Sequence, residues 1–537
     1  MMQHLLTTLL TPLLLICFAF AGQAADISIL PRPAKVEKAE GTFTLDRSTQ
    51  LVSPHEAPNL ASFLRQRIGG STGFELPSAK QAGGNMIVLE IDEGLTGPAD
   101  SYEMTVTSEQ IRIAGNTEAG VFYGIQSLLQ LLPAEIFSDE EVQADWQVPA
   151  VRISDSPRFA VRGMMLDSGR QFHTVEFIKQ FIDELASMKM NTFHWHLTEL
   201  DGWRIEIKKY PKLSEIGANL KGRGFKQQQG FYTQDEIREI VRYAAERYVT
   251  IIPEIDIPGH AYAALASYPE LLACNGAVPG EDEVSYPNRF REIMCAGKPS
   301  TYKFCTDVLT EVMALFPSRR IHIGGDEAFK GRWEKCADCN HALKQGGHGS
   351  FHHLQVDLSN RIADFLGQSN RQAVIWSDVY EPEGTQLHSN IAVSWWRALQ
   401  AGDKVFQKAV NNGVEVICSP NTYTYLNFPV TPWRGYKSDR TFDLKTAYEE
   451  NTIDPAVAKV PADKHALVQG VIGAVWTDDG LLQEMVFQRL YPRVYAIAEI
   501  AWHGGEKEPF ESFHSKVKAQ YPRLELRGIQ YGPAMKE

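Results

Sequence analysis

The sequence predicts an α/β protein: a (β/α)8 TIM barrel preceded by a small α+β domain. The chain has 537 residues, which is too long for one ordinary domain but suits a barrel plus a smaller unit. From Phe159 onward, short apolar runs alternate with segments of helical spacing, the pattern of parallel strands joined by helices. Eight such runs can be counted, which is the number of strands in this barrel.

Residues 5–20 are almost entirely apolar, and small residues follow as far as Ala25. This pattern predicts a secretory signal peptide over residues 1–25. A short membrane anchor is the alternative, because the run is marginal in length for a bilayer span. No later stretch is long and apolar enough to cross a membrane. We therefore expect an exported protein, periplasmic or secreted, with no stable membrane span.

Residues 26–157 are predicted to form the α+β domain. Residues 86–91 have the composition of a buried strand, and residues 102–107 and 111–114 alternate across a short turn as in a hairpin. Residues 119–132 have helical apolar spacing and stop before Pro133. We find no catalytic constellation in this part of the chain.

Residues 158–505 are predicted to form the barrel, followed by a polar tail, residues 506–537, packed on it. Helices are expected at 174–189, 233–247, 351–366 and 481–501, the second of them opening with a Thr233/Glu236 capping box. The eight predicted strands are residues 163–167, 192–197, 250–255, 320–324, 373–377, 391–395, 414–419 and 471–476.

Charge and cysteine content limit the partners. The net charge is −13 and there is no basic run, which argues against nucleic acid and anionic membranes as partners. Six cysteines remain beyond the signal peptide, and six allow 15 pairings. Cys336 and Cys339 could form half of a zinc site, but no second CxxC or nearby HxxxH completes it. A local disulfide or free thiols are therefore favoured, and we expect no metal and no cofactor.

Acidic and aromatic residues gather where the predicted strands end, which is where barrels of this type build their active sites. The fourth strand runs into Gly324 and Gly325 and then presents two adjacent carboxylates, Asp326 and Glu327. Tryptophan stands at three other strand ends. Such a pocket would stack on apolar ring faces and hydrogen-bond hydroxyl groups, and sugars present both surfaces.

The strand ends resemble family 20 glycoside hydrolases, the β-N-acetylhexosaminidases, and the motifs that carry the resemblance occur in the family's order over nearly all of the mature chain. These motifs are Arg162-Gly163 with Leu166-Asp167-Ser168-Gly169-Arg170, Asn191 to Leu197 (NTFHWHL), Pro253 to His260 (PEIDIPGH), His322 to Glu327 (HIGGDE) and Tyr425-Leu426-Asn427.

The resemblance implies substrate-assisted retaining hydrolysis of terminal, non-reducing N-acetyl-β-D-hexosamine residues. The 2-acetamido oxygen attacks the anomeric carbon and gives an oxazolinium ion. Glu327 would be the general acid and base, and Asp326 would hold the acetamido N–H. Because adjacent acids raise each other's pKa, we expect Glu327 to stay protonated near neutral pH. The partner would be an oligosaccharide or glycoconjugate ending in GlcNAc or GalNAc.

The resemblance implies roles for further residues. Tyr425 would donate to the acetamido oxygen, and His260 would tune Glu327 with Glu199 as its acidic partner. The expected sugar-binding residues are Arg170, Glu199, Trp376, Trp395, Asn427, Trp476 and Asp478. Trp396 is the alternative to Trp395 at the sixth strand.

Three positions depart from the commonest family pattern. Glu199 stands where an Asp is usual, which leaves open whether its longer side chain reaches His260. Asp478 stands where a Glu is usual. Asn427 stands where Asp is frequent, and an amide lacks the negative charge that would repel an anionic group at O6. We therefore expect better tolerance of 6-sulfated N-acetylglucosamine than an Asp would give.

Two other functions are compatible with parts of the pattern. His194 and His196 point to the same side of their strand, as in metal-dependent amidohydrolase barrels, although those place HxH on the first strand and add further ligands. A catalytically inactive N-acetylglucosamine-binding homologue is the non-enzyme alternative. The presence of both Asp326 and Glu327 argues against it.

Overall fold

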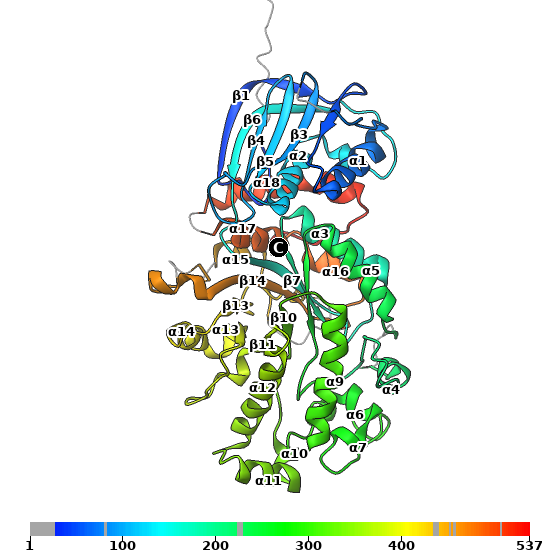
Figure 1. Cartoon of the computed structure of the whole chain (residues 1–537), viewed down its shortest axis with the longest axis vertical. Coiled ribbons are helices and arrows are strands. Elements are labelled where there is room, and N and C mark those ends of the chain that lie inside the picture. The colour runs from blue at the N-terminus through cyan, green and yellow to red at the C-terminus, as the bar shows by residue number, and fades with distance from the viewer. Residues whose placement is uncertain are drawn as a thin grey trace, which may run out of the picture.

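The computed structural model describes residues 27–79, 83–222, 229–432, 440–450, 453–454, 458–478, 480–504 and 507–536. A sheet-based first domain lies above a barrel surrounded by helices (Figure 1). The predicted (β/α)8 architecture is confirmed, since eight strands form a closed barrel in the order β10-β11-β12-β13-β14-β7-β8-β9. The predicted signal peptide lies outside the described residues.

The first domain is a six-stranded mixed sheet in the order β1-β6-β4-β5-β3-β2. Its strands are β1 Lys35–Thr44, β2 Gln50–Val52, β3 Met86–Ile91, β4 Tyr102–Val106, β5 Gln110–Gly115 and β6 Gln147–Asp155, and its helices are α1 Pro58–Thr72, α2 Glu118–Leu131 and the 3-10 turn η1 Ala134–Phe137. The strands β3, β4 and β5 and the helix α2 were predicted. The edge strand β1 was not, because it is charged and exposed along almost its whole length and shows no apolar alternation.

The barrel strands all pair in parallel, and all eight were predicted to within a few residues. They are β7 Val161–Asp167, β8 Thr192–His196, β9 Thr250–Glu254, β10 Arg320–His322, β11 Gln372–Trp376, β12 Ile391–Trp395, β13 Val416–Cys418 and β14 Val468–Val475. Every residue of β7, β8, β11 and β12 is buried, as expected for strands covered on both faces.

The helices begin where the capping residues predict. Thr174 caps α3, and Thr233 with Glu236 forms the predicted capping box of α5. The predicted helix 481–501 is interrupted around Pro492, which cannot donate a helical hydrogen bond. The helices after the first domain are α3 Val175–Ser187, α4 Lys212–Glu215, α5 Gln234–Ala245, α6 Tyr262–Ser267, α7 Pro269–Leu272, α8 Tyr286–Arg289, α9 Pro299–Leu315, α10 Gly331–Glu334, α11 Ala337–Gln345, α12 Phe351–Gly367, α13 Ala398–Ala401, α14 Lys404–Asn411, α15 Leu444–Glu449, α16 Gln483–Leu490, α17 Val494–His503 and α18 Phe510–Leu526.

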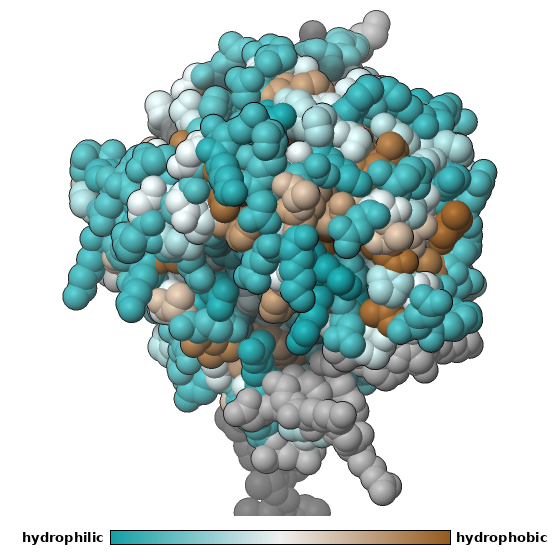
Figure 2. All heavy atoms as spheres, turned by 90° about the horizontal axis from the view of Figure 1, so that it is seen from below, coloured by the Kyte–Doolittle hydropathy of each residue, from teal (hydrophilic) through white to brown (hydrophobic). Residues whose placement is uncertain are grey.

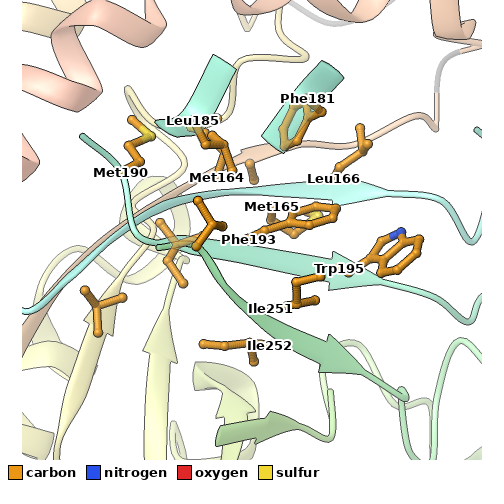
Figure 3. Packing of buried hydrophobic residues seen from close by; sticks show 14 of the residues in the cluster. Met164, Met165, Leu166, Phe181, Leu185, Met190, Phe193, Trp195, Ile251 and Ile252 are labelled. Carbon is orange, nitrogen blue, oxygen red and sulfur yellow. The ribbon is translucent and has the colours of Figure 1, made fainter. Parts of the chain in front are cut away.

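Helix α3 packs on the outside of the barrel through large apolar side chains (Figure 3). Phe181 and Leu185 point from the helix toward β7 and β8, and the rings of Phe181 and Phe193 lie 5.3 Å apart. Phe193 in turn stacks on Trp195 with ring centroids 5.5 Å apart. Because these side chains are fully buried, the strand ends that carry the polar residues rest on a rigid support.

The first domain and the barrel share a buried ion pair. Asp155, at the end of β6, accepts a hydrogen bond from Lys189 Nζ at 2.9 Å, and both side chains are fully buried. Trp502 Nε1 of α17 donates to the same carboxylate at 2.9 Å, and Lys189 Nζ also donates to the Tyr102 hydroxyl at 3.0 Å. The two domains are therefore joined by charged groups that have no contact with solvent.

The C-terminal helix α18 lies between the two domains (Figure 1). Just beyond its last turn, Arg527 pairs with Glu184 of α3 at 2.8 Å. The helix also binds the first domain, because Arg523 donates to the carbonyl oxygens of Leu129 and Leu132. Gln520 Nε2 donates to the Ser28 carbonyl at 2.7 Å, which brings the two ends of the described chain together.

The end of the molecule farthest from the first domain is mostly hydrophilic, and its apolar side chains form small separate groups (Figure 2). Among the described residues, no helix combines the length and the apolar composition that crossing a bilayer requires.

Candidate active site

The chain turns sharply where β10 ends. Gly324 and Gly325 have φ of +63° and +106°, and a Cβ on Gly324 would lie 1.8 Å from Asp256 Oδ1. The same oxygen accepts the Gly325 amide at 2.9 Å. Only glycine fits this turn, and the turn delivers Asp326 and Glu327 to the carboxyl end of the barrel. Glu327 itself has φ of +45°, a strained conformation for a residue with a side chain.

A pocket of about 160 Å³ lies over this turn. It is lined by Arg170, His260, Asp326, Glu327, Trp376, Trp396, Gln400, Tyr425, Asn427, Phe428, Arg440, Trp476 and Asp478. The structure thus brings nine of the eleven predicted site residues to one pocket. The other two are Glu199, which lies directly behind it, and Trp395, which does not face it.

The two central carboxyl groups have opposite electrostatic environments. Burial, and then the charge of Asp256, raise the pKa of Asp326 well above its usual range. The Glu327 side chain is 46% exposed, and the hydrogen bond from His260 lowers the pKa of Glu327 despite partial burial. The expectation that the adjacent acids keep Glu327 protonated is therefore wrong for the open pocket, because the hydrogen bond from His260 lowers the pKa of Glu327, whereas burial raises the pKa of Asp326.

His260 is held by a row of charged side chains behind the pocket. Its Nδ1 donates to Glu199 Oε1 at 2.5 Å, and its Nε2 lies 3.4 Å from Asp326 and 3.7 Å from Glu327. Burial opposes the imidazolium, but Glu199 and Asp326 outweigh it and raise the pKa of His260 well above its usual value. Glu199 therefore reaches His260, which answers the question raised by its extra methylene.

Arg170 completes this row of charged side chains. It forms ion pairs with Glu199 and, at 2.7 Å, with Asp167 at the end of β7. Burial opposes the ionisation of Glu199, but Arg170 and His260 overcome it and hold the pKa of Glu199 well below its usual range. The guanidinium carbon also lies 5.2 Å from the ring centre of Trp476. Arg170 is thus fixed in position at the pocket wall.

Trp376 is oriented from below by a buried carboxylate. Its Nε1 donates to Glu254 Oε1 at 2.8 Å. The other oxygen of Glu254 lies 2.8 Å from His194 Nε2 and 2.6 Å from His196 Nδ1, and His322 Nδ1 lies 3.1 Å from Oε1. The His194/His196 pair thus contacts the same carboxylate that holds the Trp376 indole.

Tyr425 lies between two tryptophans. Its ring stacks on Trp396 with centroids 6.0 Å apart and planes 10° apart, and it lies 6.1 Å from the ring of Trp476. Burial, with only a partial offset from a Trp476 hydrogen bond, raises the pKa of Tyr425 well above its usual value. The Tyr425 hydroxyl therefore keeps its proton and can act as a hydrogen-bond donor.

The structure corrects the prediction for the end of β12. Trp395 turns outward, is 3% exposed and packs 5.3 Å from the ring of Phe406 on α14. Trp396, the next residue, faces the pocket, and its Nε1 donates to Asp378 Oδ2 at 2.6 Å. Successive strand side chains point to opposite sides, so a one-residue error in the alignment exchanges a pocket residue for one that packs against a helix.

Asn427 and Asp478 also line the pocket. Asn427 is 9% exposed, and within the described part of the chain its Oδ1 has no hydrogen-bond partner. Arg440 lines the same pocket, with its guanidinium carbon 5.5 Å from the Phe428 ring centre. This part of the wall therefore combines a neutral amide with a cation.

Several contributors were missed by the sequence interpretation. Asp378 anchors Trp396, and its Oδ1 also receives Arg397 at 3.1 Å. Its position two residues after Trp376, at a strand end, was an available signal. Gln400, Phe428 and Arg440 come from loops or short connecting helices, and no spacing rule places them.

A larger cavity of about 570 Å³ is lined by residues from two segments, 279–292 and 329–335. Its walls include Phe329, which is 51% exposed, together with Arg291, Arg332 and Lys335.

The arrangement can perform acid–base chemistry on a small polar ligand with an apolar ring face. Two carboxyl groups with separated pKa values, an imidazolium and a tyrosine hydroxyl converge on a cavity walled by three indole rings, those of Trp376, Trp396 and Trp476.

Known protein families match both domains. A model described as "Glycosyl hydrolase family 20, catalytic domain" matches residues 159–505, and one described as "Glycosyl hydrolase family 20, domain 2" matches residues 26–156. The crystal structure of a β-N-acetylhexosaminidase from Bacteroides fragilis is 40% identical, with a TM-score of 0.85, over 95% of this chain and 97% of that one.

Two further relatives are informative. A β-hexosaminidase of Porphyromonas gingivalis is 35% identical over 94% of this chain, and the chain spans 64% of that protein's length. The structure of an exo β-N-acetylglucosaminidase from Vibrio harveyi, solved with N-acetylglucosamine, is 29% identical with a TM-score of 0.82. That match covers 94% of this chain and 78% of the Vibrio chain.

Proposed function

The chain belongs to glycosyl hydrolase family 20, and from this premise we propose that it is an exo-acting, retaining β-N-acetylhexosaminidase. Its substrate is an oligosaccharide or glycoconjugate that ends in N-acetylglucosamine or N-acetylgalactosamine. The observation that supports this most directly is the Asp326–Glu327 pair beside His260, facing an indole-lined pocket of about 160 Å³. A cavity of that size favours removal of one terminal sugar at a time.

The first step is attack by the substrate's own acetamido oxygen on the anomeric carbon. The bond from that carbon to the leaving oxygen breaks, Glu327 transfers its proton to the leaving oxygen, and a cyclic oxazolinium ion forms. Asp326 accepts a hydrogen bond from the acetamido N–H, and Tyr425 donates to the acetamido oxygen. In the second step, water attacks the anomeric carbon, the bond from that carbon to the acetamido oxygen breaks and restores the acetamido group, and the water gives its proton to Glu327.

Sugar binding should change the pKa values of both carboxyl groups. Glu327 is half exposed, so a bound sugar and leaving group remove water from it and raise its pKa. Asp326 gains a donor in the acetamido N–H, and a hydrogen bond to a carboxylate lowers its pKa. Both changes favour a protonated Glu327 beside an ionised Asp326, which is the state that the first step requires.

The test compares two substrates and follows the product. Nitrophenyl β-N-acetylglucosaminide should release nitrophenol readily, whereas the β-glucoside, which lacks the acetamido group, should be inert, because the mechanism takes its nucleophile from the substrate. Nuclear magnetic resonance should detect the β-anomer of the sugar product first. Comparable rates on the glucoside, or an α-anomer as first product, would contradict the mechanism.

Export is part of the proposal. The apolar residues 5–20, followed by small residues, support cleavage near Ala25 and a periplasmic or secreted enzyme. Mass spectrometry of the N-terminus of the protein recovered outside the cytoplasm should begin close to Asp26. An intact Met1 in that fraction would favour the membrane anchor instead.

A further inference from the structure

Four cysteines that are distant in the sequence meet at one point outside the active-site pocket. They are Cys274, Cys295, Cys336 and Cys339, and their sulfur atoms all lie within 4.8 Å of one another. The sequence interpretation looked for a second CxxC near Cys336 and Cys339 and found none. Because the completing pair comes as two separate cysteines, one after α7 and one before α9, spacing in the sequence could not reveal it.

The separations match a tetrahedral metal site. Cys295 Sγ lies 3.4 Å from Cys339 Sγ and 3.6 Å from Cys336 Sγ, and Cys274 Sγ lies 3.9 Å from Cys339 Sγ. Zinc–thiolate bonds of about 2.3 Å place tetrahedral sulfur ligands roughly 3.8 Å apart. All four cysteines are free.

The surroundings are built for this cluster. Cys295, Cys336 and Cys339 are at most 1% exposed. The Gly297 amide hydrogen-bonds the sulfur of Cys295, and it also bonds that of Cys339. A Cβ on Gly297 would lie 2.3 Å from the carbonyl carbon of Asp338, so this segment passes against the CxxC backbone and only glycine fits.

We propose that these four cysteines bind one structural zinc ion, contrary to the expectation from the sequence that the chain holds no metal. An all-sulfur set of four is a soft, tetrahedral donor set that selects zinc over calcium or magnesium, and four protein ligands leave no open position for catalysis. A bound metal also explains how clustered thiols persist in an exported protein, where unprotected pairs oxidise.

The site joins the two loops that carry the catalytic machinery. The segment after β9 contains His260 and continues to Cys274 and Cys295, and the segment after β10 contains Glu327 and continues to Cys336. Between them, Trp333 Nε1 donates to the Met294 carbonyl at 2.9 Å. The Met294 amide donates to the Pro258 carbonyl at 2.9 Å, two residues from His260. These two hydrogen bonds connect the cysteine cluster to the loop that holds the imidazole.

The decisive measurement is the metal content of the full chain purified without chelators. Elemental analysis should find one zinc per chain, and alkylation followed by peptide mass spectrometry should find the four cluster cysteines protected until the metal is removed. Cys305 and Cys418, which are buried elsewhere, are the internal controls for thiols that need only unfolding to react. Two disulfides among the four cysteines, or four reducible thiols without stoichiometric metal, would overturn the proposal.

Variants provide an independent test. Cys339→Ser should lower the zinc content at least tenfold, whereas the matched Cys305→Ser variant should keep one zinc per chain. If Cys339→Ser does not fold, cobalt exchanged into the wild-type protein should give the intense visible bands of a tetrahedral ion and sulfur-to-metal charge transfer in the near ultraviolet. A weak octahedral spectrum would contradict an all-sulfur site.

Discussion

The Oε1 atom of Glu199 lies 2.5 Å from Nδ1 of His260, and both side chains are buried behind the pocket. This pair keeps the imidazole positively charged between two carboxyl groups. The charge lowers the pKa of Glu327 and also works against the rise in the pKa of Asp326 that burial causes. The Glu199–His260 contact therefore influences the pKa values of both carboxyl groups through the imidazolium.

Removing the negative charge of Glu199 should shift the pH profile. In Glu199→Gln, the pKa of His260 falls, and the pKa values of Asp326 and Glu327 both rise because the imidazolium no longer lowers them. Asp326 must be ionised and Glu327 protonated, so both limbs of the kcat/KM profile should move to higher pH. A profile of reduced height but unchanged limbs would assign Glu199 a role in packing alone, and Glu484→Gln, at an exposed position, is the control.

Glu327→Gln should remove the general acid. A positioned acid contributes about 10²–10⁴-fold, so we expect a loss in that range on chitobiose, whose leaving group needs protonation. The loss on a nitrophenyl glycoside should be smaller, because nitrophenolate leaves without a proton. Steady-state rates on both substrates test this difference, with Glu334→Gln as the control on the neighbouring helix α10. Equal losses on the two substrates would assign Glu327 a different role.

The two adjacent tryptophans at the end of β12 should respond differently to the same substitution. Trp396→Phe removes a pocket wall and the hydrogen bond to Asp378, so KM should rise severalfold or more while the melting temperature changes little. Trp395→Phe should lower the melting temperature by a few degrees, because it removes packing against α14, and leave KM unchanged. The reverse pattern would show that the wrong indole has been placed in the pocket.

Asn427→Asp should discriminate between neutral and anionic sugars. A carboxylate beside O6 would repel a 6-sulfate and would neutralise part of the field of Arg440, which lines the same pocket. We therefore expect a selective loss of kcat/KM on 6-sulfated nitrophenyl N-acetylglucosaminide. The unsulfated sugar is the control, and equal effects on both would refute the idea.

Glu499 should make stability depend on pH. Burial raises the pKa of Glu499 to about 7, although the Arg32 amide donates to it at 2.7 Å. A carboxyl group that is protonated when folded and ionised when unfolded costs stability as pH rises from its unfolded pKa toward 7. Glu499→Gln should therefore gain up to roughly 3 kcal/mol relative to wild type between about pH 4 and 8. Urea unfolding at both pH values measures this, and a constant difference would contradict it.

The sequence was sufficient where side-chain pattern and backbone turn coincide. The apolar runs predicted all eight barrel strands, and Gly324-Gly325 identified the turn before Asp326. The sequence was insufficient where a shift of one residue along a strand, or a contact between distant segments, decides which side chains form a site. Trp395 and Trp396 are chemically identical, and only the orientation of β12 separates them. Neither the Cys274–Cys339 proximity nor the charged edge strand β1 leaves a local signal.

The buried pair of Asp155 and Lys189 has a consequence for recombining this protein. A barrel expressed without its first domain would lose Asp155 and Tyr102, which accept the hydrogen bonds of the Lys189 ammonium. Helix α18 would likewise lose the carbonyl acceptors that Arg523 uses. The two domains therefore depend on each other's contact residues. A chimaera that exchanges one domain must also keep the residues that this domain contacts in the other.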